Sequence, residues 1–146
     1  MKKLFLASLT LTFFAVGTTL FQMSSCKKAG AQTPKTYPIE GLWIGIYTVD
    51  GQPSLGSQYY SFILKPDGTM IQDGKDADKQ AICIGTWKLT GTNLSCTFTS
   101  IYGASGIGII ENATANWDNT GKLTSGIWSN PSPGTGSGTF TMTRVN

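Results

Sequence analysis

The stretch Ala81–Ile101, which reads AICIGTWKLTGTNLSCTFTSI, decides the fold of this chain. Gly91-Thr92 is a suitable two-residue turn between two runs of alternating apolar and polar residues. With that turn, Trp87 faces Cys96, and the apolar side chains gather on one face, apart from two isoleucines. A slip of one residue would move a whole strand's side chains to the other face. The pattern therefore predicts an antiparallel β-hairpin in this register.

Similar short runs of β-branched and aromatic residues fill the rest of the chain after residue 36, and no helical periodicity interrupts them. Turn residues separate the runs, as in Pro66-Asp67-Gly68 and in Asp118–Gly121. The expected strands are 40–49, 58–65, 69–73, 81–90, 93–101, 107–116, 122–129 and 138–145. This order predicts an all-β, eight-stranded antiparallel up-and-down barrel. A two-sheet sandwich is the alternative.

The composition excludes several classes of function. The chain has 146 residues, no histidine and only 13% charged residues. Catalytic systems that need a histidine are therefore excluded, and so are metal sites with histidine ligands. The net charge of +3 comes from five lysines before Tyr37, because the remainder carries six basic and eight acidic residues, a net of −2. A nucleic-acid partner is not expected, since there is no basic patch.

The N-terminus predicts export. Met1-Lys2-Lys3 is followed by an apolar run that ends near Phe21. Met23-Ser24-Ser25-Cys26 comes next and resembles a bacterial lipobox, although methionine stands where leucine is more usual. That resemblance implies a lipoprotein signal peptide at 1–25 and acylation (palmitate) of Cys26. An ordinary secretory signal is the alternative.

The polar segment 26–36 predicts a lipidated, flexible tether, which leaves 37–146 as the barrel domain. Several acyl chains would make the membrane attachment lasting. The residue after Cys26 is Lys27 and not an aspartate, and in this the chain resembles lipoproteins that are sent to the outer membrane. We therefore expect a bacterial cell-envelope protein that is lipid-anchored in the outer membrane and faces the periplasm.

Two cysteines remain in the expected barrel, and the hairpin register keeps them apart. Cys83 lies four residues along the strand from Trp87, the partner of Cys96, or about 14 Å at ~3.4 Å per residue. A disulfide tolerates roughly half that distance. We expect two free core thiols, no disulfide and no metal site on them. Asp73–Lys79 is an acidic cluster whose glycine is misplaced for a calcium loop, so a solvated loop is expected there.

Gly41-Leu42-Trp43 near the start of the barrel and Arg144 near its end resemble the lipocalin pattern. The segments 65–69 and 85–91 likewise resemble small lipocalin-like (calycin) lipoproteins of Gram-negative bacteria. The resemblance implies that Gly41, Trp43 and Arg144 close the barrel, with the arginine packed across the tryptophan. The chain is shorter than a typical lipocalin and lacks the Thr-Asp-Tyr motif and the helix that follows the barrel. Avidin is a looser match.

The remaining candidates for a functional site are the aromatic and apolar side chains on the inner face of the barrel. They could line a pocket for an apolar ligand or simply fill the core. The candidate lining residues are Phe62, Cys83, Trp87, Leu94, Cys96 and Phe98. Glu40 and Glu111 are the only glutamates, and no pair of carboxylates stands out for acid–base catalysis.

The sequence therefore predicts a membrane-tethered, non-enzymatic module that binds a small apolar molecule or a cell-envelope component, with no cofactor. The alternative is a structural or assembly lipoprotein whose filled barrel binds a protein partner, of unknown identity, through its outer face. A hydrolase using carboxylates alone is the least favoured hypothesis.

Overall fold

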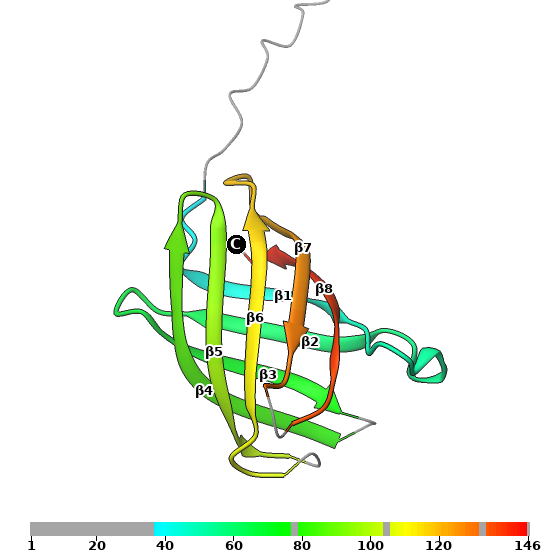
Figure 1. Ribbon diagram of the computed structural model, residues 1–146. Coiled ribbons are helices and arrows are strands. Elements are labelled where there is room, and N and C mark those ends of the chain that lie inside the picture. The colour runs from blue at the N-terminus through cyan, green and yellow to red at the C-terminus, as the bar shows by residue number, and fades with distance from the viewer. Residues whose placement is uncertain (1–36, 77–78, 104–105, 132–133, 146) are drawn as a thin grey trace, which may run out of the picture. The chain divides into compact units, whose positions relative to one another are not determined.

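The computed structural model describes residues 37–76, 79–103, 106–131 and 134–145. These residues form an all-β barrel in which each strand pairs antiparallel with its sequence neighbours and the last strand pairs with the first (Figure 1). The expected up-and-down barrel is confirmed. The strands are β1 (Gly41–Tyr47), β2 (Gln58–Leu64), β3 (Thr69–Asp76), β4 (Lys79–Thr90), β5 (Asn93–Tyr102), β6 (Ile110–Trp117), β7 (Lys122–Ser129) and β8 (Ser137–Arg144). One 3-10 turn, η1 (Pro53–Leu55), lies between β1 and β2.

The signal peptide expected at 1–25, Cys26 and the tether at 26–36 lie outside the described residues. No helix in the described part of the chain is long and apolar enough to cross a membrane.

The β4–β5 hairpin has the register that the sequence predicted. Trp87 pairs with Cys96, and Gly85 pairs with Phe98. The pairing shifts only at the far end, between Ile82 and Cys83. The two isoleucines that break the pattern, 82 and 84, fall on the outer side of the barrel, where residue 84 is half exposed.

Two regions differ from the sequence expectation. The acidic cluster Asp73–Lys79 was expected to be a solvated loop, and this is wrong, because β3 runs to Asp76 and β4 begins at Lys79. Asp76 pairs with Lys79, so only residues 77–78 connect the two strands. β6 begins at Ile110, three residues later than expected. Gly106 and Gly108 both have positive φ, which breaks the extended conformation before it.

A bulge in β7 explains a strand whose two faces were ambiguous in the sequence. The pairing with β8 shifts between Leu123 and Gly126, and Ser125 has a φ of 51°. One extra residue reverses the alternation of side chains. Leu123 and Trp128 are consequently both buried, whereas Ile127 is exposed.

The barrel closes where β1 meets β8. Trp43 and Arg144 are partners in this pairing, so the residues expected at the closure lie side by side. The Arg144 guanidinium donates hydrogen bonds to the Glu40 carbonyl oxygen at 2.9 and 3.3 Å and lies 5.7 Å from the centre of the Tyr37 ring. The Trp43 indole donates to the Ile39 carbonyl oxygen at 2.7 Å. The cation–π partner of Arg144 that the structure gives is therefore Tyr37, and packing of the arginine across Trp43 stays a prediction.

Gly41 provides a test of this closure. It has a φ of +131°, and a Cβ at this position would lie 2.8 Å from the Arg144 guanidinium. We expect Gly41→Ala to lower the free energy of unfolding by about 1–2 kcal/mol, because it strains the backbone and displaces the arginine. Chemical denaturation measures the change. Gly51→Ala is the control, since Gly51 also has positive φ but no atom within 4 Å of an added Cβ. An equal loss in both variants would mean that the contact with Arg144 contributes nothing.

The hydrophobic core fills one half of the barrel interior. We call this half the closed end, because Tyr37 and the β2–β3, β4–β5 and β6–β7 turns lie there, and the Tyr37 amide donates to the Asn119 carbonyl oxygen. The opposite end, with the β1–β2, β3–β4, β5–β6 and β7–β8 connections, is the open end. The largest fully buried side chains are Trp43, Phe62, Leu64, Met70, Leu94, Phe98 and Leu123.

Candidate functional site: a polar-floored pocket at the open end

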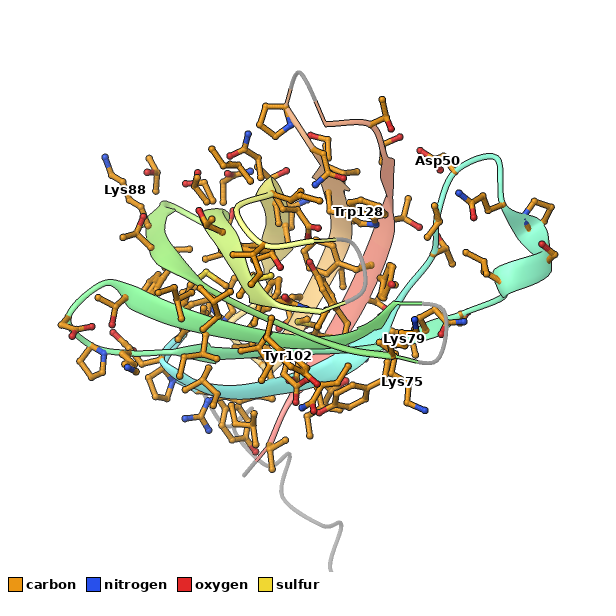
Figure 2. All side chains as sticks on the ribbon, turned by 90° about the horizontal axis from the view of Figure 1, so that it is seen from below. Asp50, Lys75, Lys79, Lys88, Tyr102 and Trp128 are labelled. Atoms are coloured by element: carbon orange, nitrogen blue, oxygen red, sulfur yellow. The ribbon has the colours of Figure 1, made fainter. Side chains whose placement is uncertain are left out.

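The open end of the barrel holds a pocket of about 480 Å³. A volume of this size fits a small organic molecule. Its walls come from the strand ends that meet there, and loop residues 134–136 complete the rim. Figure 2 shows the barrel from below, with Trp128 near the rim and with Lys75 and Lys79 at the tip of the β3–β4 hairpin.

Three aromatic rings form one wall. Tyr47 packs against Tyr60 with ring centroids 5.0 Å apart and meets Trp128 edge-on at 5.8 Å. Each ring is fixed at its polar end or by its neighbours. The Trp128 indole donates to the Thr48 carbonyl oxygen at 2.9 Å, and the Tyr47 hydroxyl donates to the Lys75 carbonyl oxygen. The wall is therefore a rigid aromatic surface.

The floor of the pocket is a hydrogen bond across the barrel. The Tyr60 hydroxyl on β2 donates to a carboxylate oxygen of Glu111 on β6. These strands are four apart in a closed ring of eight, so they lie on opposite sides of the interior. Beneath this bond, Tyr60 packs against Phe62 and Phe140 of the core. The pair thus separates the filled half of the barrel from the open half.

Burial in the barrel perturbs the ionisation of both partners. It raises the pKa of Glu111 from 4.5 to about 7, and the hydrogen bond from Tyr60 opposes this rise only in part. Burial, and then the nearby Glu111 carboxylate, hold the Tyr60 pKa well above its ordinary value of 10.0. Tyr60 is therefore a hydrogen-bond donor at all physiological pH values, whereas Glu111 changes its charge near neutrality.

Glu111 has no cationic partner among the described residues. The pocket lining includes one cationic side chain from the described chain, Lys75, which is exposed at the rim. The other polar side chains near the floor, Gln72 and Ser100, are uncharged, and both are buried. A carboxylate can accept about four hydrogen bonds, and Tyr60 provides one.

The two cysteines contribute no nucleophile to this site. Both are free and buried, and burial raises the pKa of each to about 12. The thiolate is the reactive form of cysteine, so these groups stay inert at neutral pH. Cys83 lies in the pocket wall opposite Ser100, and Cys96 lies in the core.

The pocket takes only Cys83 from the six residues that the sequence suggested as ligand lining. Phe62, Leu94, Cys96 and Phe98 all belong to the buried core, and Trp87 is half-buried against it, with its indole donating to the Lys65 carbonyl oxygen at the closed end.

Sequence reasoning missed Tyr60, Glu111 and Trp128 as parts of one site. The sequence held one signal for Glu111. It lies two and four residues before Ala113 and Ala115 on β6, so all three face the same side of the sheet, and both alanines are buried. An acidic residue in phase with buried alanines faces the interior of a barrel. Glu111 is partly buried, and a carboxylate withdrawn from water in a cavity is uncommon and points to a functional site.

The described residues of the pocket include one carboxyl group. Glu111 is the only carboxylate among the described residues that line the pocket, so it lacks a second acid of different pKa with which to divide acid and base roles. Groups of three or more potential metal ligands are absent from the described residues. What the pocket offers is an aromatic wall, hydrogen-bonding amide and hydroxyl groups, and one titratable carboxyl.

The closed antiparallel barrel is compatible with the lipocalin-like fold that the sequence resembles. Comparison of the chain with protein-family models, with curated proteins and with solved structures gave no match.

Proposed function

We propose that this protein is a lipocalin-like binding module, not an enzyme, that holds a small amphipathic molecule in the open end of its barrel. The observation that carries the proposal is the 480 Å³ pocket, in which an aromatic wall stands above the polar floor formed by Tyr60 and Glu111. Ligand sites combine a mostly apolar surface with a few fixed polar groups, as this pocket does. The ligand expected from the sequence was apolar; the polar floor favours one with a polar group as well.

The position of the pocket agrees with a tethered carrier. The chain enters the barrel at the closed end, where Tyr37 lies, and the pocket is at the other end. If Cys26 is acylated, as the lipobox-like sequence indicates, the barrel is attached to the membrane through the segment that precedes Tyr37. We propose that the protein is anchored in the bacterial outer membrane and takes its ligand from the periplasm or from a partner there.

Titration with the neutral dye Nile red tests the binding function. We expect dye emission to rise to saturation at one dye per protein. Ala81 lines the pocket, so the larger side chain of Ala81→Phe should occupy part of the cavity and weaken binding at least tenfold. Ile84→Phe is the matched control on the same strand, since Ile84 is half exposed on the outer side. It should leave the affinity unchanged.

Dye binding that Ala81→Phe and Ile84→Phe weaken equally would place the dye elsewhere and contradict the proposal. Extraction of the protein from its own cells with organic solvent is a second measurement. A stoichiometric small molecule in the extract would support ligand carriage.

The alternative, a structural or assembly protein, has one supporting observation. Apolar side chains form a row across the outer faces of adjacent strands, because Leu42 pairs with Ile63, Ile63 with Ile71, and Ile71 with Ile84. All of these are exposed except Ile71, which is half-buried. Contiguous exposed apolar surface is typical of interaction sites. Absence of any dye response and an extract without a ligand would favour this outer-face function over ligand carriage.

A further inference from the structure

We propose that the natural ligand is an organic cation, an amine with an apolar or aromatic body, and that Glu111 is its counter-charge. This inference rests on the proposed binding function and identifies its class of ligand. It follows from the position of Glu111, from the charge around it and from the aromatic rings in one wall of the pocket.

The first argument is the carboxyl without a counter-ion. Glu111 lines the pocket, the Tyr60 hydroxyl donates to it, and no ion pair reaches it from the described residues. A buried negative charge without a cation is unfavourable, and an incoming cation removes that penalty. A neutral or anionic ligand would leave it in place.

The second argument is the aromatic wall. Tyr47, Tyr60 and Trp128 all line the pocket, and the first two rings are 5.0 Å apart. The faces of aromatic rings attract organic cations, more strongly when the cation is removed from water. Aromatic rings next to a carboxylate therefore favour an alkylammonium or arylalkylammonium group over a metal ion.

Tyr60 acts as a positioning residue. Its hydroxyl remains protonated, so it always donates to Glu111 and turns one carboxylate oxygen toward β2. The remaining acceptor sites of the carboxylate are then available to the ligand. The same hydrogen bond favours the charged form of Glu111 over the neutral one.

Binding of a cation should be coupled to loss of a proton from Glu111. The titratable or charged side chains that line the pocket with it are Tyr47 from β1, Tyr60 from β2, Lys75 from β3 and Cys83 from β4, and Cys96 from β5 lies near Tyr60. The described β7 residue in the lining, Trp128, is uncharged, and no described residue of β8 lines the pocket. The pKa of Glu111 is raised to about 7. Its ionised fraction, and with it the affinity for a cation, should rise about tenfold from pH 6 to pH 8.

Three probes of the same shape test the inference: 2-phenylethylammonium, 2-phenylethanol and 3-phenylpropanoate, titrated by calorimetry at pH 6, 7 and 8. We expect the ammonium to bind at least tenfold more tightly than the alcohol at pH 8, with the propanoate weakest. Glu111→Gln should remove this preference, whereas Glu40→Gln, which changes the other glutamate outside the pocket, should keep it. Tyr60→Phe should move the pH midpoint upward.

Equal affinities for ammonium and alcohol, an affinity for the ammonium that falls with rising pH, or a preference that survives in Glu111→Gln would each overturn the inference. Nile red binding that is sensitive to Ala81→Phe, without preference for the ammonium, would leave the binding function standing and reject the cation alone. Failure of both the dye and the three probes to bind would reject both proposals.

Discussion

Phe62→Ala is expected to lower the free energy of unfolding by about 3–5 kcal/mol, because it removes a large ring from the centre of the core. Phe62 is fully buried and meets three aromatic rings edge-on: Tyr60 at 4.9 Å, Phe140 at 5.6 Å and Phe98 at 5.9 Å. Removal of its ring abolishes all three contacts and leaves a cavity in a close-packed interior.

Urea denaturation of the two proteins measures this effect, with the midpoint shift converted through a common slope. Ile63→Ala is the matched control, because Ile63 follows Phe62 on β2 and is 41% exposed on the outer face. It should cost less than about 1 kcal/mol. If Phe62→Ala also lowered the free energy of unfolding by less than about 1 kcal/mol, the closed end would not be a packed core.

The order of the strands and the register of one hairpin could be predicted from the sequence, because these depend on local patterns. The Gly91-Thr92 turn sets the register of β4 and β5, and the alternation of side chains then assigns their faces. Local patterns failed where a local irregularity intervened. In β7, the bulge at Ser125 reverses the alternation, so Leu123 and Trp128 face inward despite their odd spacing.

The pocket was not predictable from local patterns, because it depends on closure of the barrel. Tyr60 and Glu111 are 51 residues apart and on opposite walls. Whether an inward-facing residue packs in the core or borders a cavity depends on the summed volume of side chains at its level. Phe62 and Cys83 share a face of the sheet and both belong to the buried core, yet only Cys83 also borders the pocket.

Glu111→Gln is expected to stabilise the ligand-free protein by about 2–3 kcal/mol at pH 8 and to have almost no effect at pH 4. The folded-state pKa is about 7, against 4.5 for the unfolded chain. Below pH 4.5 both states hold the proton, so the carboxyl is neutral in each. Between 4.5 and 7 the folded protein binds more protons than the unfolded chain, and its stability falls as pH rises. Above pH 7 the full penalty of the buried charge is present.

Thermal or urea unfolding of the parent, Glu111→Gln and Glu40→Gln across pH 4 to 8 measures the difference. The amide oxygen that Glu111→Gln introduces can still accept the Tyr60 hydrogen bond, so the variant removes the charge and keeps the contact. Glu40→Gln shows the effect of removing a glutamate charge outside the pocket. A constant difference between parent and Glu111→Gln at all pH values would mean that Glu111 is as well solvated in the folded protein as in the unfolded chain.

Tyr60→Phe should act in the opposite direction to Glu111→Gln. Without the hydroxyl, the carboxylate loses the hydrogen bond that lowers its pKa, so stability should continue to fall with pH beyond 7. The carboxyl group in the pocket lowers the stability of the ligand-free protein, and the Tyr60 hydrogen bond keeps that group ionisable near neutral pH. A bound cation would restore that stability, so the same pH series repeated with saturating 2-phenylethylammonium should show the parent gaining most at pH 8 and Glu111→Gln gaining little.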